Sequence, residues 1–129
     1  MIGSDTITTD YVLGFFPGKL KPEQSPGGFN VIYVVATLMI KPETHAEFIA
    51  AATACIKETR KEPGNIAYDL HESVTDHSKM VFVEQWENME ALGPHRAAEH
   101  MKTFGRVAVK CMTAPPKIEY ITPAKVETR

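Results

Sequence analysis

The spacing of apolar residues changes several times along this chain, and each change predicts a new element. The run Val31–Ile40, VIYVVATLMI, is apolar at nearly every position, which is typical of a central strand buried on both faces. From Lys41, apolar residues recur at helical spacing until Pro63-Gly64, which predicts a helix that ends there. The stripe of this helix comprises Phe48, Ala51, Ala52, Cys55 and Ile56.

The second half of the chain predicts a hairpin, a helical region and a last strand. In Asn65–Ser73, apolar and polar residues alternate, with Ile66, Tyr68 and Leu70 on one face and Asp69, His71 and Ser73 on the other. The turn VTDHSK then leads into an antiparallel partner, MVFVEQW. Helical spacing follows to about Met112 with a break near Ala98, and the prolines around KIEYI favour an edge strand.

The predicted order is strand, helix, strand, strand, helix, strand, which is the split βαβ or ferredoxin-like arrangement of the α+β class. Right-handed crossovers place both helices on one face of a four-stranded antiparallel sheet. Val31–Ile40 is nevertheless apolar on both faces. We therefore expect a homodimer in which two sheets pack face to face, unless the N-terminal segment covers the second face.

Three regions are expected: an N-terminal arm (1–30), a ferredoxin-like domain (31–122) and a C-terminal tail (123–129). The arm contains FFPGKLKPEQSPGGF, whose prolines and glycines suit an irregular segment. Two interpretations remain open, a partly disordered extension or an arm docked on an apolar surface. In the second case the docking residues are Tyr11, Val12, Leu13, Phe15 and Phe16.

Composition narrows the class of protein. With 129 residues, 43% of them hydrophobic, and a net charge of −2, the chain has the size of one domain and no basic excess for nucleic acid. Its longest apolar run is about half of a membrane span, and no signal-like segment begins the chain, so we expect a cytoplasmic protein without membrane contact. Cys55 and Cys111 lie on apolar helical stripes and are expected to be reduced core residues.

The stretch EQWENMEALGPHRAAEHM, Glu84–Met101, carries the chemistry. On a continuous helix, His95 and His100 would lie about 140° apart, and the sequence forces no third ligand, so no metal is expected. No glycine-rich loop opens a helix, so no nucleotide cofactor is expected either. Along the preceding strand, Phe82, Glu84 and Trp86 share one face. Burial there would raise the pKa of the Glu84 carboxyl and favour an imidazole partner; the alternative is a solvated or backbone-bonded carboxylate.

One tyrosine and three further histidines lie on or next to the predicted strands and helices. Tyr68 can reach the same wall from the neighbouring strand, or it is a core tyrosine bonded to the backbone. His71 points to the opposite face, where an interface role is favoured, and His45 and His77 are interpreted as solvated.

EPGNIAYDLHES followed by MVFVEQWENMEALGPHRAAEHMKTF resembles the antibiotic biosynthesis monooxygenase family of small dimeric proteins. The shared pattern is a Glu-Pro-Gly turn, a Tyr-x-Leu strand, Glu-x-Trp, Glu-Ala-Leu and two histidines, and it covers about 31–122. The resemblance implies a ferredoxin-like dimer with a pocket between sheet and helices. The family also includes haem-degrading proteins, which use an Asn, a Trp and a His. The corresponding residues here are Val35, His95 and Gly105, so haem degradation is not expected.

The function expected from this resemblance is cofactor-independent monooxygenation of quinol or polycyclic phenolic substrates. His95 is the candidate base, Glu84 would orient it or share its proton, and His100 would line the mouth or stabilise an oxyanion. Aromatic walls are expected from Tyr68, Trp86 and Phe82. The alternatives are a proton-transfer isomerase of a small oxidised sugar derivative, with Arg96, Lys102 and Arg106 as candidate cations, or a non-catalytic small-molecule-binding stress protein.

Overall fold

The computed structural model describes Ile7–Thr8 and residues 30–129. The elements are β1 (Ile7–Thr8), β2 (Ile32–Met39), η2 (Pro42–Thr44), α1 (His45–Thr59), β3 (Asn65–Glu72), β4 (Lys79–Trp86), η3 (Met89–Ala91), α2 (Leu92–Ala97), α3 (Glu99–Cys111) and β5 (Lys117–Ile121). Within this described part, no helix is long and apolar enough to cross a membrane.

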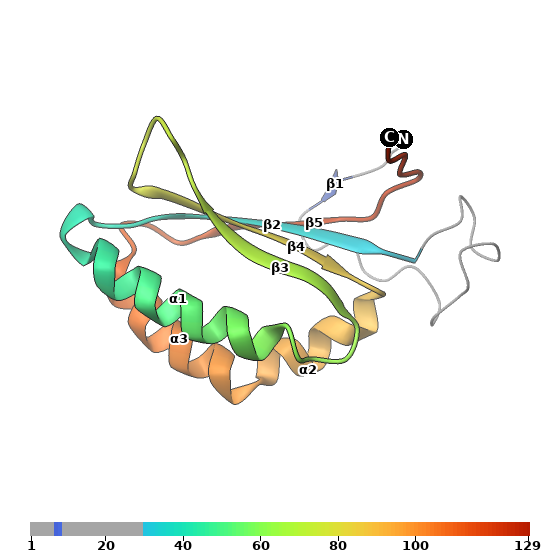
Figure 1. The fold of residues 1–129 in the computed structure, drawn as a ribbon, viewed down its shortest axis with the longest axis horizontal. Coiled ribbons are helices and arrows are strands. Elements are labelled where there is room, and N and C mark those ends of the chain that lie inside the picture. The colour runs from blue at the N-terminus through green and yellow to red at the C-terminus, as the bar shows by residue number, and fades with distance from the viewer. Residues whose placement is uncertain (1–6, 9–29) are drawn as a thin grey trace.

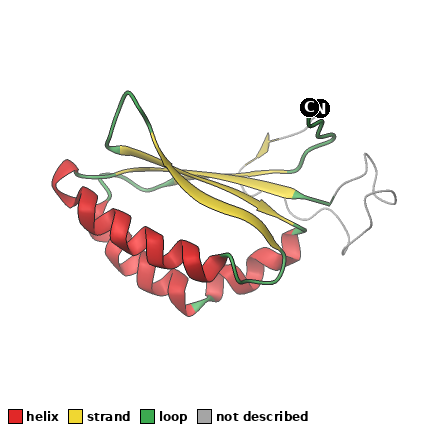
Figure 2. Cartoon of the chain, viewed as in Figure 1, coloured by secondary structure: helices red, strands yellow, loops and turns green. Residues whose placement is uncertain are grey.

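The sheet has the strand order β1-β5-β2-β4-β3, and each neighbouring pair is antiparallel. Helices α1 and α3 pack against each other on one side of it, and no helix of the described residues lies on the other side (Figures 1 and 2). The predicted α+β ferredoxin-like fold is therefore confirmed. One strand was not predicted: Ile7–Thr8 of the arm pairs with the outer side of β5. The arm's apolar cluster at positions 11–16 lies outside the described residues.

The two faces of β2 differ in burial. Ile32, Val34, Ala36 and Leu38 are buried with the helix side chains Phe48 and Phe104, whereas the alternate residues of β2 are only partly buried. On that second face, Val83 of β4 is paired with Val35 and is 40% exposed. The second face of β2 is thus only partly covered within one chain, and its expected burial depends on a further covering surface. Sheet-on-sheet dimerisation remains a prediction.

Two backbone features position the site. After α1 the chain turns at Gly64, whose φ of +87° favours glycine. The second helical region breaks at Ala98, as predicted, because Ala98 is extended (φ −67°, ψ 147°) between α2 and α3. Its carbonyl accepts from the amides of Met101 and Lys102, so a new helix starts at once. Cys55 and Cys111 are buried free thiols, as expected.

Candidate active site

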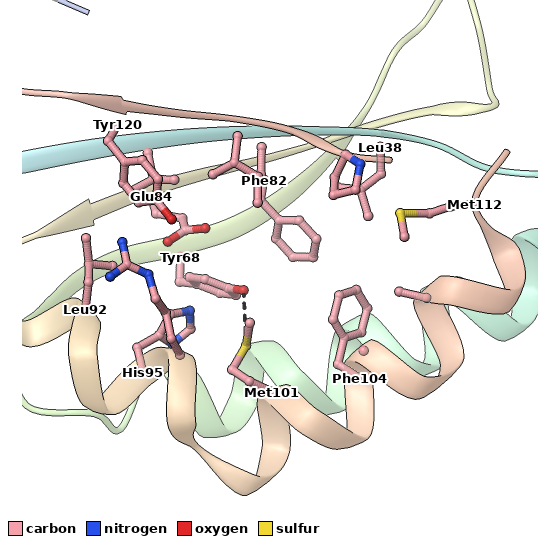
Figure 3. A pocket seen from close by; sticks show the side chains of 17 residues that line it. Leu38, Tyr68, Phe82, Glu84, Leu92, His95, Met101, Phe104, Met112 and Tyr120 are labelled. Atoms are coloured by element: carbon pink, nitrogen blue, oxygen red, sulfur yellow. Dashed lines mark hydrogen bonds between the residues drawn. The ribbon is translucent and has the colours of Figure 1, made fainter. Parts of the chain in front are cut away.

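An apolar cavity of about 350 Å³ lies between the sheet and the helices (Figure 3). Its walls come from β2, β3, β4, β5, α2 and α3, and they bring together side chains that are far apart in the sequence. Figure 3 shows Tyr68, Phe82 and Glu84 on the sheet side, facing His95, Met101 and Phe104 on the helices. Four of the residues predicted for the site therefore converge on one cavity: Tyr68, Phe82, Glu84 and His95.

Glu84 is a buried carboxyl with a side-chain donor. It is 6% exposed, and its Oε1 accepts a hydrogen bond of 2.8 Å from the indole Nε1–H of Trp86. Burial raises the pKa of Glu84 to about 7, although the Trp86 bond and the nearby Arg96 charge both act to lower it. The predicted imidazole partner is wrong, because the period-two spacing of the strand places Trp86 beside Glu84 and supplies a donor locally.

His95 reaches the cavity from α2 and is 4% exposed. Its Nδ1 lies 3.1 Å from Oε2 and 3.2 Å from Oε1 of Glu62. Its ring packs 4.7 Å from Trp86 and 5.5 Å from Tyr68, measured between centroids. Burial lowers the pKa of His95, and the contact with Glu62 opposes this shift. Glu62, rather than Glu84, therefore orients this imidazole.

His100 does not line the apolar cavity, contrary to the expectation that it would line the mouth or face an oxyanion. Its Nε2 lies 2.6 Å from Oε2 of Glu62, so both histidines contact one carboxylate. The angular argument that separated them is wrong, since the break at Ala98 means that no continuous helix joins them. The ligand atoms of Glu62, His95 and His100 lie within 4.8 Å of one another, close enough to hold a metal ion.

Glu62 is the residue that sequence reasoning missed. It lies in the turn after α1, where its amide donates to Thr59 and its carbonyl accepts from Asn65. Glu62 is the first residue of the Glu-Pro-Gly triplet, which the sequence identifies as a turn and as part of the family pattern but not as a source of a site residue. A hydrophobic period identifies the faces of helices and strands, but it says nothing of where a turn residue points.

The aromatic candidates have different positions. Tyr68 and Phe82 line the cavity, whereas Trp86 is fully buried, donates to Glu84 and is not part of the cavity wall. The Tyr68 hydroxyl lies 4.0 Å from the Met101 sulfur, a weak contact in place of the backbone partner considered above (Figure 3). Burial, followed by the charge of Glu84, raises the pKa of Tyr68, so its phenol stays neutral.

The other histidines lie away from the cavity. His71 is exposed on β3. His45 and His77 are not simply solvated, because both contact the carboxylate of Glu72, His45 at 2.6 Å. These two contacts, His45 first, lower the pKa of Glu72.

One candidate cation lies at the cavity. Arg96 lines it and stacks over the Tyr120 ring, with 4.9 Å from the guanidinium carbon to the ring centroid. Lys102 and Arg106 are exposed and do not line it.

The fold and cavity define a class: small α+β ferredoxin-like proteins that enclose an apolar small-molecule pocket between sheet and helices. Comparison with known proteins is consistent with this class and narrows it. The family model described as "Antibiotic biosynthesis monooxygenase" matches residues 31–107, and the chain belongs to that family. The resemblance drawn from the sequence is thereby confirmed.

Individual relatives support the assignment. The Bacillus subtilis protein named "Putative monooxygenase YcnE" is 31% identical over 85 residues, which is 66% of this chain and 90% of YcnE. A crystal structure of a "putative antibiotic biosynthesis monooxygenase" from Caulobacter crescentus is 31% identical with a TM-score of 0.71, covering 77% of this chain and 92% of its own. The structure of Rv0793 from Mycobacterium tuberculosis is 26% identical with a TM-score of 0.69, covering 76% and 97%.

Proposed function

We propose that this protein is a cofactor-independent monooxygenase of quinol or polycyclic phenolic substrates, with His95 as the general base. The observation that carries the proposal is the position of His95, a buried imidazole in the wall of an apolar cavity, held through Nδ1 by Glu62. When the Nδ1–H donates to the carboxylate, the lone pair of the neutral ring is on Nε2. That nitrogen makes no hydrogen bond to any described residue, and it is the atom proposed to accept the substrate proton.

The reaction needs only the substrate and dioxygen. His95 removes a phenolic proton, and the phenolate transfers an electron to dioxygen far more readily than the phenol does. The radical pair would then combine inside the apolar cavity, where few polar groups compete for it. In balance, SH₂ and O₂ give SO and H₂O, so the substrate gains one oxygen atom, supplies all four electrons and requires no external reductant.

The cavity walls fit such a substrate. Tyr68, Phe82 and Phe104 offer ring faces and edges to a planar aromatic molecule, and the volume of about 350 Å³ is within the range of small-molecule sites. Glu84 would be the second acid/base group, because a carboxyl with a pKa of about 7 can return a proton to the oxygen that leaves as water. Glu62 is a positioning residue, since it touches His95 rather than the substrate.

Oxygen uptake tests the proposal directly. Wild type and His95→Ala would be compared on a panel of hydroquinones and tricyclic phenols in buffer treated with EDTA. Loss of a general base should lower kcat about 10²–10⁴-fold. His77→Ala is the matched control, because His77 contacts Glu72, does not line the cavity and should leave the rate unchanged. Equal rates for wild type and His95→Ala would exclude His95 as the base.

The second candidate is a proton-transfer isomerase that uses the same base on a small oxidised sugar derivative. The observation in its favour is Arg96, which places a cation at the cavity. Only this one of the three predicted cations does so, and its guanidinium is stacked on Tyr120. Turnover that continues at full rate without oxygen would favour the isomerase over the monooxygenase.

A further inference from the structure

The cluster of Glu62, His95 and His100 lies between two cavities. His95 lines the apolar cavity, whereas Glu62 lines a second cavity of about 500 Å³ on the side of the turn, together with Glu87 and Glu90. The side chains are largely buried, with exposed fractions of 13% for Glu62, 5% for His95 and 21% for His100. A small ion could reach the cluster through the second cavity, whose acidic side chains favour cations.

We propose that Glu62, His95 and His100 form a binding site for a divalent first-row transition metal ion, with Zn²⁺ as the representative ion. Two imidazoles and one carboxylate are a ligand set that zinc accepts in open, three-ligand sites. The ligand atoms are Nδ1 of His95, Nε2 of His100 and Oε2 of Glu62. Glu62 contacts the two nitrogens at 3.1 and 2.6 Å, and all three atoms lie within 4.8 Å of one another.

The two Glu62 separations are close to what an ion requires, and the two imidazole nitrogens lie within 4.8 Å of each other. Around a tetrahedral zinc with bonds of about 2 Å, ligand atoms lie roughly 3.3 Å apart. The Glu62 contacts are slightly shorter than this, so the carboxylate would move back a little and the imidazoles would turn toward the ion. A fourth position would be left for water.

The backbone holds the three ligands in place without the ion. The turn that carries Glu62 packs against η3, so closely that a Cβ at Gly64 would lie 2.6 Å from the Cβ of Ala91. The break at Ala98 then orients His95 and His100 toward one carboxylate. The ion would therefore bind to a preformed site and would not have to organise the chain.

Occupancy would change the chemistry of His95. A neutral imidazole that coordinates through Nδ1 carries its proton on Nε2. The Nε2 lone pair assigned above to the base is then lost. This consequence rests on the proposed function, whereas the metal site itself does not. The metal-bound and catalytic forms of the protein exclude each other.

Calorimetric titration of the full chain with Zn²⁺, after removal of metals with EDTA, tests the site. Wild type should bind one ion per chain, and His100→Ala should bind it about 100-fold more weakly or not at all. His77→Ala is the matched control, because His77 belongs to the surface pair on Glu72 and should leave the titration unchanged. Unchanged binding by His100→Ala, or loss of binding in His77→Ala, would overturn the proposal.

A second measurement does not depend on the folding of a variant. Anomalous diffraction at the zinc edge from a wild-type crystal soaked in Zn²⁺ should place one peak between the three ligand atoms, and a peak only elsewhere would overturn the site. Both experiments need no substrate. Zinc binding here without any oxygen uptake would therefore refute the proposed function alone, and oxygen uptake without zinc binding would refute the metal site alone.

Discussion

Glu84 offers a test of the cavity's electrostatics that needs no substrate. Its carboxyl is 6% exposed, and burial raises its pKa to about 7 from 4.5. The folded state therefore prefers the protonated carboxyl, and ionisation above this pKa destabilises the fold relative to the unfolded chain. In Glu84→Gln the side-chain oxygen can still accept from Trp86, but the group no longer ionises. The substitution thus removes the ionisation of the side chain and retains its shape.

The magnitude follows from the shift. A rise in pKa from 4.5 to about 7 corresponds to about 3 kcal/mol of unfolding free energy, which the protein loses as pH rises to and through 7. The sign is that of a raised acid: the favourable contribution is complete below pH 4.5 and is lost above pH 7. Glu84→Gln should therefore be more stable than wild type by about 3 kcal/mol at pH 8.5 and by less than about 1 kcal/mol at pH 5.

Urea denaturation at the two pH values measures this difference. Protein concentration must be held constant, because association would add to the apparent stability. Glu43→Gln, at an exposed residue of η2, is the control and should show no such pH dependence. A stability difference between Glu84→Gln and wild type that is the same at pH 5 and pH 8.5 would refute the reasoning.

Three further predictions concern other parts of the molecule. Saturating Zn²⁺ should abolish oxygen uptake by wild type, and EDTA should restore it. His100→Ala should keep its rate in the presence of Zn²⁺. Equal inhibition of the two proteins would show that zinc does not act through this site. Gly64→Ala should cost about 1–3 kcal/mol in denaturation, because alanine disfavours φ +87° and its Cβ would meet Ala91, and a neutral effect would show that the turn relaxes. Deleting residues 1–28 should leave the fold intact but weaken the expected dimer in sedimentation equilibrium, and an unchanged affinity would show that the arm does not join subunits.

The fold was predictable because its signals are periodic. The alternation in Asn65–Ser73 and the helical stripe around Phe48 each identify a face, and right-handed crossovers leave few ways to join them. Even the break at Ala98 was visible in the pattern. The limit of sequence-based prediction appears at β2. Its apolar second face indicates that another surface covers it, but the sequence does not identify that surface.

The site was predictable only in part, and the division follows from distance along the chain. Phe82 and Glu84 were placed on one face by the strand period, and the hairpin pairing brings Tyr68 to the same wall, which was one of the two alternatives left open for it. The contact between Glu62 and His95 joins residues 33 positions apart through a turn and a helix. No local period in the sequence indicates such a contact. For this reason Glu84, and not Glu62, was predicted to be the partner of His95.

The corrected assignment changes what the cavity can do. Burial lowers the pKa of His95 and raises that of Glu84 to about 7, so near neutral pH a neutral base and a partly protonated carboxyl can share one apolar space. Had the two groups been paired, as expected from the sequence, proton exchange between them would have competed with the substrate. Because Glu62 contacts His95 and Trp86 contacts Glu84, each group would act on a substrate independently in the proposed reaction. In the proposed reaction, transfer of a substrate proton to His95 would place a phenolate beside an imidazolium, and in these apolar surroundings their attraction would be stronger than in water.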